Sequence, residues 1–144
     1  VDNGLRWHVR AFDRKSKSFR DFVLTRISKV TIKDTPNEDE SAQADTEWQR
    51  LIPLQLVPHP KNVEHPTAIE MDYGMENKQL LIEVRAAMAG YLLRRWNVDC
   101  TERGSLKGAE YQLWLQNRFT LNNVQNLAIA PGYEAKDNGS GGGN

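Results

Sequence analysis

The chain has 144 residues, of which 39% are hydrophobic and 26% are charged, and its 19 basic and 19 acidic side chains give a formal net charge of zero. This length fits one ordinary domain or two very small ones, and the neutral charge argues against a general coat for nucleic acid. The single cysteine, Cys100, excludes an internal disulfide. No apolar run approaches the roughly 18–20 residues of a membrane span, so we expect no membrane partner and a reducing, cytoplasmic location.

Positive charge is concentrated at the beginning of the chain. Residues 1–33 hold nine Lys and Arg against three acids, a net charge of +6, whereas residues 34–47 hold six acids and no base. The neutrality therefore arises because two oppositely charged blocks cancel. A surface that receives a negatively charged partner would explain the basic block. Charged strand faces whose Arg stems cover apolar edges would explain it equally well.

The first predicted element is a β-hairpin. Residues 6–12, RWHVRAF, alternate with the period of two that is typical of a strand. The apolar face, expected to be core, consists of Trp7, Val9 and Ala11. The opposite face is basic and carries Arg6, His8, Arg10 and Phe12. After a polar turn at 13–18, residues 19–32 again have the composition of a strand. Since a two-stranded hairpin is marginal in water, we expect further strands, from this chain or from sequence before Val1, to complete the unit.

The acidic stretch 34–47 is predicted to be a loop and the boundary between two units, because it contains Pro36 and no apolar periodicity. It is most simply a solvated run of charge. A second hypothesis is that it mimics a polyanion and occupies the basic face until a ligand displaces it. The glycine-rich stretch 138–144 is predicted to be a flexible tail.

The remaining predicted elements lie in residues 48–137. A strand over 51–60 is ended by Pro58 and Pro60, and residues 68–74 form either a short strand or the start of a helix. Residues 78–97 are the clearest predicted helix, and 110–117 alternate as a strand. From Phe119 onward the pattern predicts no element.

The helix predicted over 78–97 rests on an apolar stripe at spacings of three and four. The stripe comprises Leu81, Val84, Met88, Tyr91 or Leu92, and Trp96. Gly90 costs such a helix about 1 kcal/mol relative to alanine, which close packing against a neighbour would explain. The end of the helix, around Leu92, Leu93 and Trp96, is more apolar than one packed face requires, which favours a homodimer contact there.

Spaced residues in the hairpin resemble the WYL-domain family. They are Arg6-Trp7, Asp13, Phe19-Arg20 and Arg26-Ile27, within the stretch LRWHVRAFDRKSKSFRDFVLTRI. The triplet that names the family stands here as Trp7-His8-Val9, so its Tyr and Leu are replaced. The following region resembles the C-terminal extension of bacterial WYL-domain transcription regulators, especially those of phage-defence operons. The similar segments there are LVPHP (56–60), IEMDYGM (69–75) and YLLRRW (91–96).

The resemblance implies an α+β fold in which a small Sm-like or SH3-like β-barrel precedes a compact α+β dimerisation unit. It implies a basic barrel face that binds a nucleic acid or a nucleotide, and a homodimer formed through the C-terminal extension. The first barrel strands and the N-terminal winged helix-turn-helix of the family are absent from the sequence. Binding of operator DNA would belong to that absent domain, so we do not assign it to these residues.

The candidate ligand-binding residues lie in the hairpin and comprise Trp7, His8, Arg10, Arg20 and Arg26. Guanidinium groups bind phosphate oxygens with two parallel hydrogen bonds, so three of them converging from neighbouring strands would make an anion site. Neighbouring aromatic rings would supply the stacking surface that single-stranded nucleic acid uses. Trp7 shares a face with Val9 and is therefore expected to shape the floor of the site from the core. His8 is as easily an ordinary surface residue as a ligand contact.

Other sites are discouraged by the sequence. His59, Glu64 and His65 lie in a loop with several prolines and have no further clustered ligands, whereas a metal site needs three or four placed donors. Cys100 has no motif partner. There is no phosphate-binding glycine loop and no catalytic constellation, so we expect no cofactor and no enzymatic activity.

The sequence therefore predicts three parts: a barrel portion at 1–33, a linker at 34–47 and an α+β extension at 48–137. The predicted function is ligand sensing and dimerisation in a bacterial transcription regulator. An anionic ligand on the basic face would modulate operator binding. The alternative is a constitutive structural and dimerisation module that binds no ligand.

Overall fold

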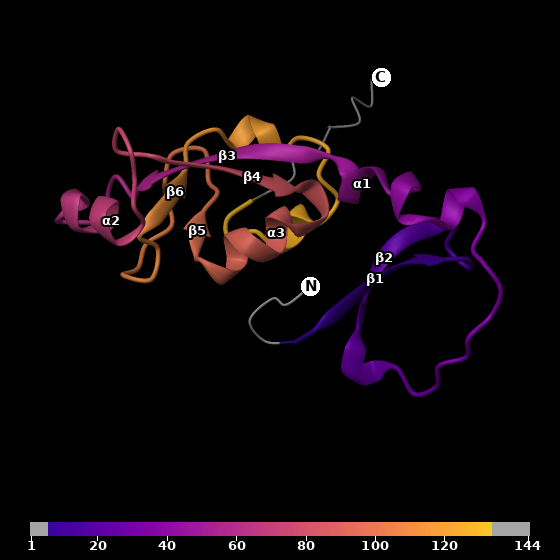
Figure 1. The fold of residues 1–144 in the computed structure, drawn as a ribbon. Coiled ribbons are helices and arrows are strands. Elements are labelled where there is room, and N and C mark those ends of the chain that lie inside the picture. The colour runs from indigo at the N-terminus through magenta and orange to yellow at the C-terminus, as the bar shows by residue number, and fades with distance from the viewer. Residues whose placement is uncertain (1–5, 134–144) are drawn as a thin grey trace, which may run out of the picture.

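The structure, a computed structural model, describes residues 6–133 and contains two sheets with helices between and beside their strands (Figure 1). This confirms the predicted α+β class. The smaller sheet is the antiparallel hairpin of β1 (His8–Asp13) and β2 (Ser18–Val23). The larger sheet has four strands in the order β4-β3-β6-β5. The first five residues and the predicted tail at 138–144 lie outside the described residues.

The second hairpin strand is shorter than its composition predicts. β2 ends at Val23, the 3-10 helix η1 (Leu24–Arg26) follows, and residues 27–37 have no regular structure. Val30 and Ile32 are 80% and 95% exposed there, because no described strand lies beside them. High β-propensity forms a strand only where a neighbouring strand pairs with it. Within residues 6–133 the sheets do not close into a barrel, so the expected Sm-like barrel is not seen.

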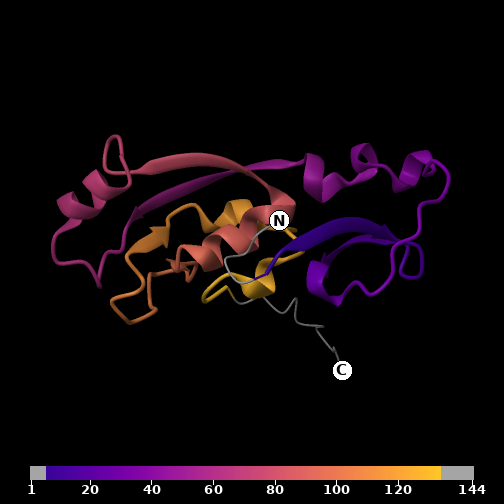
Figure 2. The same ribbon diagram turned by 60° about the horizontal axis from the view of Figure 1, so that its bottom comes forward.

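The acidic stretch is not a free loop. It forms two 3-10 turns, η2 (Glu38–Glu40) and η3 (Ala42–Ala44), before the short helix α1 (Thr46–Gln49). These turns lie against the hairpin, as both ribbon views show (Figures 1 and 2). Four residues make one helical turn, which begins where the Asp45 side chain accepts a hydrogen bond from the backbone N–H of Trp48.

β3 (Leu51–Pro58) is the central strand of the larger sheet and confirms the strand predicted over 51–60. It pairs antiparallel with β4 (Leu80–Arg85) on one side and with β6 (Leu113–Leu115) on the other. The short β5 (Val98–Asp99) runs parallel to β6. β6 covers only the middle of the strand predicted over 110–117. Residues 66–72 form the helix α2 (Pro66–Asp72), which decides the ambiguity left over 68–74.

The helix predicted over 78–97 is wrong in its first third. Residues 80–85 are strand β4, and the helix α3 (Ala86–Arg95) begins only after Arg85. The stretch Leu80–Val84 contains apolar residues at both two-residue and helical spacings, so the pattern alone does not separate the two structures. Pairing with β3 decides the matter, since it places alternate residues of β4 toward the core.

The core lies between the four-stranded sheet and α3, with the C-terminal turns closing one side (Figure 1). Those turns, η4 (Arg118–Leu121) and η5 (Leu127–Ile129), lie where the sequence predicted no element. Their fully or nearly buried side chains are Leu121, Val124, Leu127 and Ala130. At the end of α3, Leu93 is fully buried, and Leu92 and Trp96 are partly buried against the core, so the homodimer contact expected there stays a prediction.

Gly90 shows why α3 tolerates a glycine. A Cβ atom at this position would lie 2.8 Å from Cγ1 of Ile129 and even closer to the backbone oxygen of Asn126. The Asn126 side chain also bonds across this contact, donating to the carbonyl of Ala87 at 2.6 Å. The close packing predicted for Gly90 is therefore confirmed, and its neighbour is the segment before η5.

Candidate functional site

The register of the hairpin assigns its two faces. Arg10 lies opposite Asp21, and Ala11 lies opposite Arg20. Since successive residues of a strand point to opposite sides, Arg10 and Arg20 point to opposite faces. The face with Arg10 is turned toward the rest of the molecule, whereas Trp7, on the other face, is 63% exposed. The predicted orientation is thus reversed: the basic face is inside and the apolar face is outside.

Arg10 is the centre of a buried ion-pair cluster. Its side chain is 12% exposed, and its Nε and Nη2 donate to the two carboxylate oxygens of Asp45 at 2.5 and 2.9 Å. Its Nη1 donates to Asp21 at 3.2 Å. Burial opposes the charged guanidinium, but the hydrogen bonds and charges of the two carboxylates outweigh it and raise the pKa of Arg10. Arg10 therefore holds together the hairpin and the acidic segment.

The same cluster reaches the larger unit through Asp21. The hydroxyl of Tyr91, on α3, donates to Asp21 at 2.7 Å, and burial followed by this hydrogen bond raises the pKa of Tyr91. The His8 ring lies beside Tyr91 with 5.3 Å between ring centroids. His8 is therefore placed against α3, on the inner face of the hairpin.

A second connection runs through α1. Asp45 caps this helix, and the Trp48 ring packs under the guanidinium of Arg85, whose carbon lies 4.7 Å from the ring centroid. Arg85 Nη1 also donates to the Trp48 carbonyl at 2.6 Å. Since Arg85 is the last residue of β4 and the N-cap of α3, the acidic segment is linked directly to the start of that helix.

Two hollows lie between the hairpin and the acidic segment. One has a volume of about 610 Å³ and the other about 450 Å³, and both are lined by Phe12, Phe19 and Glu40. The larger one opens at the hairpin turn beside Arg14, Lys17 and Ser18, and the smaller one reaches Arg10, Asp45 and Trp48. The two phenylalanine rings stand edge to face with centroids 5.2 Å apart. The two hollows are concave, carry aromatic rings in walls that are otherwise largely polar, and have volumes of the size that binds small ligands.

Arg14 faces the larger hollow and binds an acid of the linker. Its Nε and Nη2 donate to the two oxygens of Glu40 at 2.6 and 2.8 Å. These bonds raise the pKa of Arg14 and lower that of Glu40. The Arg14 side chain is 69% exposed, so this fork-to-fork contact is open to competition by another anion.

The five predicted site residues are not brought together. Arg10 and His8 lie on the inner face, whereas Trp7 and Arg20 lie on the outer face, where Arg20 contacts Asp13 at 3.4 Å. Arg26 is exposed in η1. The three arginines therefore do not converge, because the strand register places Arg10 and Arg20 on opposite faces of the hairpin. The predicted site residues leave out three that line the hollows, namely Phe12, Arg14 and Phe19. The opposite charges of residues 1–33 and 34–47 were a signal that could have located this site, because they indicate that the two segments lie together.

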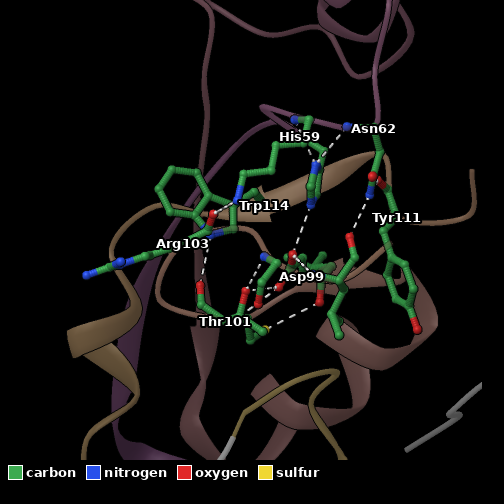
Figure 3. A network of polar contacts seen from close by, with 12 residues as sticks. His59, Asn62, Asp99, Thr101, Arg103, Tyr111 and Trp114 are labelled. Atoms are coloured by element: carbon green, nitrogen blue, oxygen red, sulfur yellow. Dashed lines mark hydrogen bonds and ion pairs between the residues drawn. The ribbon is translucent and has the colours of Figure 1, made fainter. Parts of the chain in front are cut away.

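A separate polar network holds two loops of the larger unit (Figure 3). His59 and Asp99 are fully buried, with Nε2 of the ring 2.9 Å from the carboxylate. Nδ1 of His59 accepts from the backbone N–H groups of Lys61 and Asn62, both at 3.1 Å, so the ring proton is on Nε2 and points at Asp99. Within residues 6–133 no three acids, histidines or cysteines gather as metal ligands. Both ring nitrogens of His59 are thus bonded within this network.

Asp99 is satisfied from three directions. It accepts from the backbone N–H and the hydroxyl of Thr101 at 2.8 and 2.7 Å, and from the backbone N–H of Leu106 at 3.0 Å. Burial opposes its charge, but these hydrogen bonds and that of His59 lower the pKa of Asp99. The adjacent Cys100 is fully buried, which raises the pKa of its thiol to about 12. Neither residue faces either hollow.

Comparison with known proteins places the larger unit in a family. Residues 51–137 match the family described as "BrxR transcriptional regulator, C-terminal dimerization domain". The chain is also 36% identical over 125 residues to the "DNA-binding transcriptional repressor CapW" of Pseudomonas aeruginosa, covering 86% of this chain and 41% of that protein. A protein of the same name from Escherichia coli (strain KTE188) is 36% identical over 119 residues, covering 82% of this chain and 39% of the relative.

The chain spans about two fifths of the length of the curated relatives it matches. Their names describe regulators rather than enzymes, in agreement with the prediction of no enzymatic activity. None of the helices in residues 6–133 has the length and apolarity that crossing a membrane requires. The family match covers the sheet, α3 and the C-terminal turns that form the core. The chain therefore belongs to the family of BrxR transcriptional regulators, through their C-terminal dimerization domain.

Proposed function

We propose that this chain is the ligand-sensing and dimerisation part of a DNA-binding transcriptional repressor, with residues 1–33 contributing to a WYL domain. The observation that carries this proposal is the match of residues 51–137 to a dimerization domain, continued by 36% identity to repressors over 125 residues that extend beyond the matched unit. Operator DNA would be bound by a winged helix-turn-helix outside this sequence. A cytoplasmic location and a role in a phage-defence operon complete the proposal.

The proposed ligand is a nucleotide or a single-stranded nucleic acid, and the proposed site is the pair of hollows between the hairpin and the acidic segment. Phe12 and Phe19 offer an aromatic surface on which a base can stack. Arg14 and Lys17 stand at the opening and can bind phosphate. Arg10 lies deeper, in the wall of the smaller hollow, so it would support the site rather than receive the phosphate first.

Glu40 marks where a phosphate would bind. Its carboxylate forms the same two-bonded contact with Arg14 that a phosphate forms with a guanidinium. Because the Arg14 side chain is 69% exposed, an anionic ligand can reach the guanidinium and replace the Glu40 carboxylate. This supports the hypothesis that the acidic segment acts as a displaceable substitute for the ligand.

Displacement of the acidic segment would be transmitted to the dimerization unit through α1. Trp48 packs under Arg85 at the start of α3, so a shift of η2 and η3 changes the contacts at that helix. A difference of about 1–3 kcal/mol in ligand affinity between two arrangements of the dimer would suffice for regulation. If the ligand is a single-stranded nucleic acid, we propose that it continues over the outer face of the hairpin and contacts Trp7, Arg20 and Arg26. His8 is proposed to position the hairpin on α3.

The test is a titration of the chain with a short oligothymidylate and with ATP at low salt, followed by tryptophan fluorescence, to which Trp48 in the wall of the smaller hollow contributes. Arg14→Ala and Lys17→Ala are each expected to weaken binding and to reduce the salt slope by about one. Glu40→Gln is expected to strengthen binding several-fold, because it removes the competing carboxylate. Arg94→Ala, an exposed position on α3, is the matched control. If the parent chain binds neither probe, the constitutive dimerisation module is the correct reading.

A further inference from the structure

The outer edge of the four-stranded sheet is open along β4. This strand pairs with β3 on one side, and within residues 6–133 no strand pairs with its other side. An open edge presents unpaired backbone N–H and C=O groups and can pair with another strand. The chemistry of this edge therefore suits one kind of partner, namely the backbone of another extended segment.

The backbone groups that face this edge belong to Leu81 and Glu83. In β3, Gln55 exchanges bonds with Gln116 and the Asn117 side chain, at 2.9 and 2.8 Å, and His59 donates to Gln112 at 2.8 Å. The odd-numbered residues of β3 thus turn their backbone toward β6, and the even-numbered ones toward β4. The register pairs Leu54 with Ile82, so Ile82 bonds to β3 while its two neighbours point outward.

The open part of the edge is short and has defined ends. At one end the outward groups of Gln79 are already bonded to Glu76, in a tight turn with two backbone hydrogen bonds of 3.1 Å. At the other end Ala86 donates to Arg50 at 2.9 Å and the chain enters α3. Between them the sequence Leu81-Ile82-Glu83 contains neither the proline nor the lysine that commonly protects an edge.

Exposed leucine side chains accompany this edge in the part of the chain that the structure describes. Leu81 is 63% exposed, on the side of the sheet away from α3, and Leu51 on the same side is 54% exposed. At the helix end that the sequence favoured for self-association, Leu93 is fully buried, and Leu92 and Trp96 are partly buried against the core. Among the described residues, the β4 edge is thus where backbone groups and an exposed leucine coincide.

We propose that the Leu81–Glu83 edge pairs with the same edge of a second copy of this chain, antiparallel, around a twofold axis at Ile82. The occupant is a second copy because the unit belongs to a dimerization-domain family, and a twofold axis makes one strand edge complementary to itself. The inference deepens the self-association of the proposed function and rests on it. The two sheets then form one continuous sheet through the dimer.

The charge of Glu83 fixes the register. An axis at Glu83 would place two carboxylates directly opposite each other, and a shift toward Gln79 would meet the turn at Glu76. An axis at Ile82 places Leu81 opposite Glu83 of the partner subunit, twice by symmetry. Four backbone hydrogen bonds then form in the open window, since each Leu81 exchanges two with the partner subunit's Glu83.

The test is sedimentation equilibrium of the whole chain at low salt, using charge pairs that the register specifies. Leu81→Glu places two carboxylates opposite each other at both contacts, so the dimer is expected to weaken at least about tenfold. Leu81→Lys provides an opposite charge to Glu83 and is expected to keep the dimer. The double variant Leu81→Glu/Glu83→Lys restores complementary charges and is expected to recover most of the loss. Since both side chains are exposed, circular dichroism should show an unchanged fold.

Glu83→Pro gives an independent check, because its N–H points away from β3 and is not needed for the fold. It is expected to abolish the dimer, whereas Glu83→Gln, which keeps the N–H, is expected to retain it. A dimer unaffected by Leu81→Glu and by Glu83→Pro would overturn this interface and leave the proposed dimerisation standing elsewhere. Equal weakening by Leu81→Glu and Leu81→Lys would overturn the register. A parent chain that stays monomeric would overturn both the interface and the self-association on which it rests.

Discussion

Arg10 and Asp45 are 35 residues apart in the sequence and form a two-bonded ion pair in the interior. Their side chains are 12% and 4% exposed, so neither is available at the surface. The arginine that the sequence assigned to a ligand instead fastens the acidic segment to the hairpin. Arg14 and Glu40 form a second two-bonded ion pair, in which the Arg14 side chain is 69% exposed and the Glu40 side chain is 10% exposed. Because its arginine is open to solvent, this pair is the natural comparison.

Removing one partner of the buried pair is expected to destabilise the protein strongly. Arg10→Met leaves Asp45 and Asp21 without their shared cation, and the free energy of unfolding should fall by about 3 kcal/mol. Asp45→Asn keeps a good N-cap for α1 but loses the charge, so it should cost less than Asp45→Ala, which loses both. Urea unfolding of Arg10→Met, Asp45→Asn and the double variant Arg10→Met/Asp45→Asn measures the coupling free energy between Arg10 and Asp45.

The control for this prediction is Arg14→Ala. Because the Arg14 guanidinium is 69% exposed, water can replace its bonds to Glu40, so Arg14→Ala should lower the free energy of unfolding much less than Arg10→Met does. Equal losses for Arg10→Met and Arg14→Ala would show that burial of the Arg10 cluster contributes nothing.

Gly90→Ala is expected to destabilise the protein, although alanine is the better helix former. The added methyl group would meet the Asn126 carbonyl and Cγ1 of Ile129, so the segment before η5 would have to move. We expect a loss of about 1–3 kcal/mol, against a gain of about 1 kcal/mol from helix propensity alone. Gly74→Ala is the control, since nothing lies within 4 Å of its Cβ position and only its left-handed backbone, with φ of 59°, opposes the change. A raised melting temperature for Gly90→Ala would contradict the close contact.

Acid is expected to loosen the network around Asp99. Because folding lowers the pKa of Asp99 below its ordinary value of 3.8, its contribution is fully present above about pH 4. That contribution is lost as the pH falls through the lower, folded-state pKa. Asp99→Asn should destabilise the protein at pH 7, because its amide N–H groups would face the donors of His59 and Leu106.

Unfolding measured between pH 2 and pH 7 checks this prediction. The parent chain should lose stability more steeply toward acid than Asp99→Asn does. Asp72→Asn, at an exposed position, should follow the parent curve. Parallel curves for the parent and Asp99→Asn would mean that other carboxylates carry the acid response.

Cys100 is expected to resist thiol reagents in the folded protein. Its thiol is fully buried, burial raises its pKa to about 12, and the Sγ donates to the carbonyl of Val98. The reactive thiolate is therefore nearly absent at pH 8. Labelling by a disulfide reagent should follow the fraction unfolded in urea; rapid labelling without urea would show that the β5 region opens locally.

The sequence correctly predicted those elements that depend on residues close together in the chain. The polar residues 13–18 predicted the turn between β1 and β2. Two-residue alternation and Pro58 predicted the strand β3 and its end. The close packing at Gly90 followed from the cost of glycine in a helix. The length of β2 and the start of α3 did not follow, because both depend on whether another strand lies alongside.

The sequence by itself determined the basic start and the acidic segment able to neutralise it, since charge is a sum over residues. Its local periodicities and its family resemblance predicted the α+β class. Only the tertiary structure decided which face of the hairpin is inside, because alternation defines two faces without saying which one meets a neighbour. Packing on α3 and the acidic segment turned Arg10 inward and left Trp7 outside. Pairing across the sheet likewise made 80–85 a strand, since a backbone hydrogen bond needs a partner that no local pattern supplies.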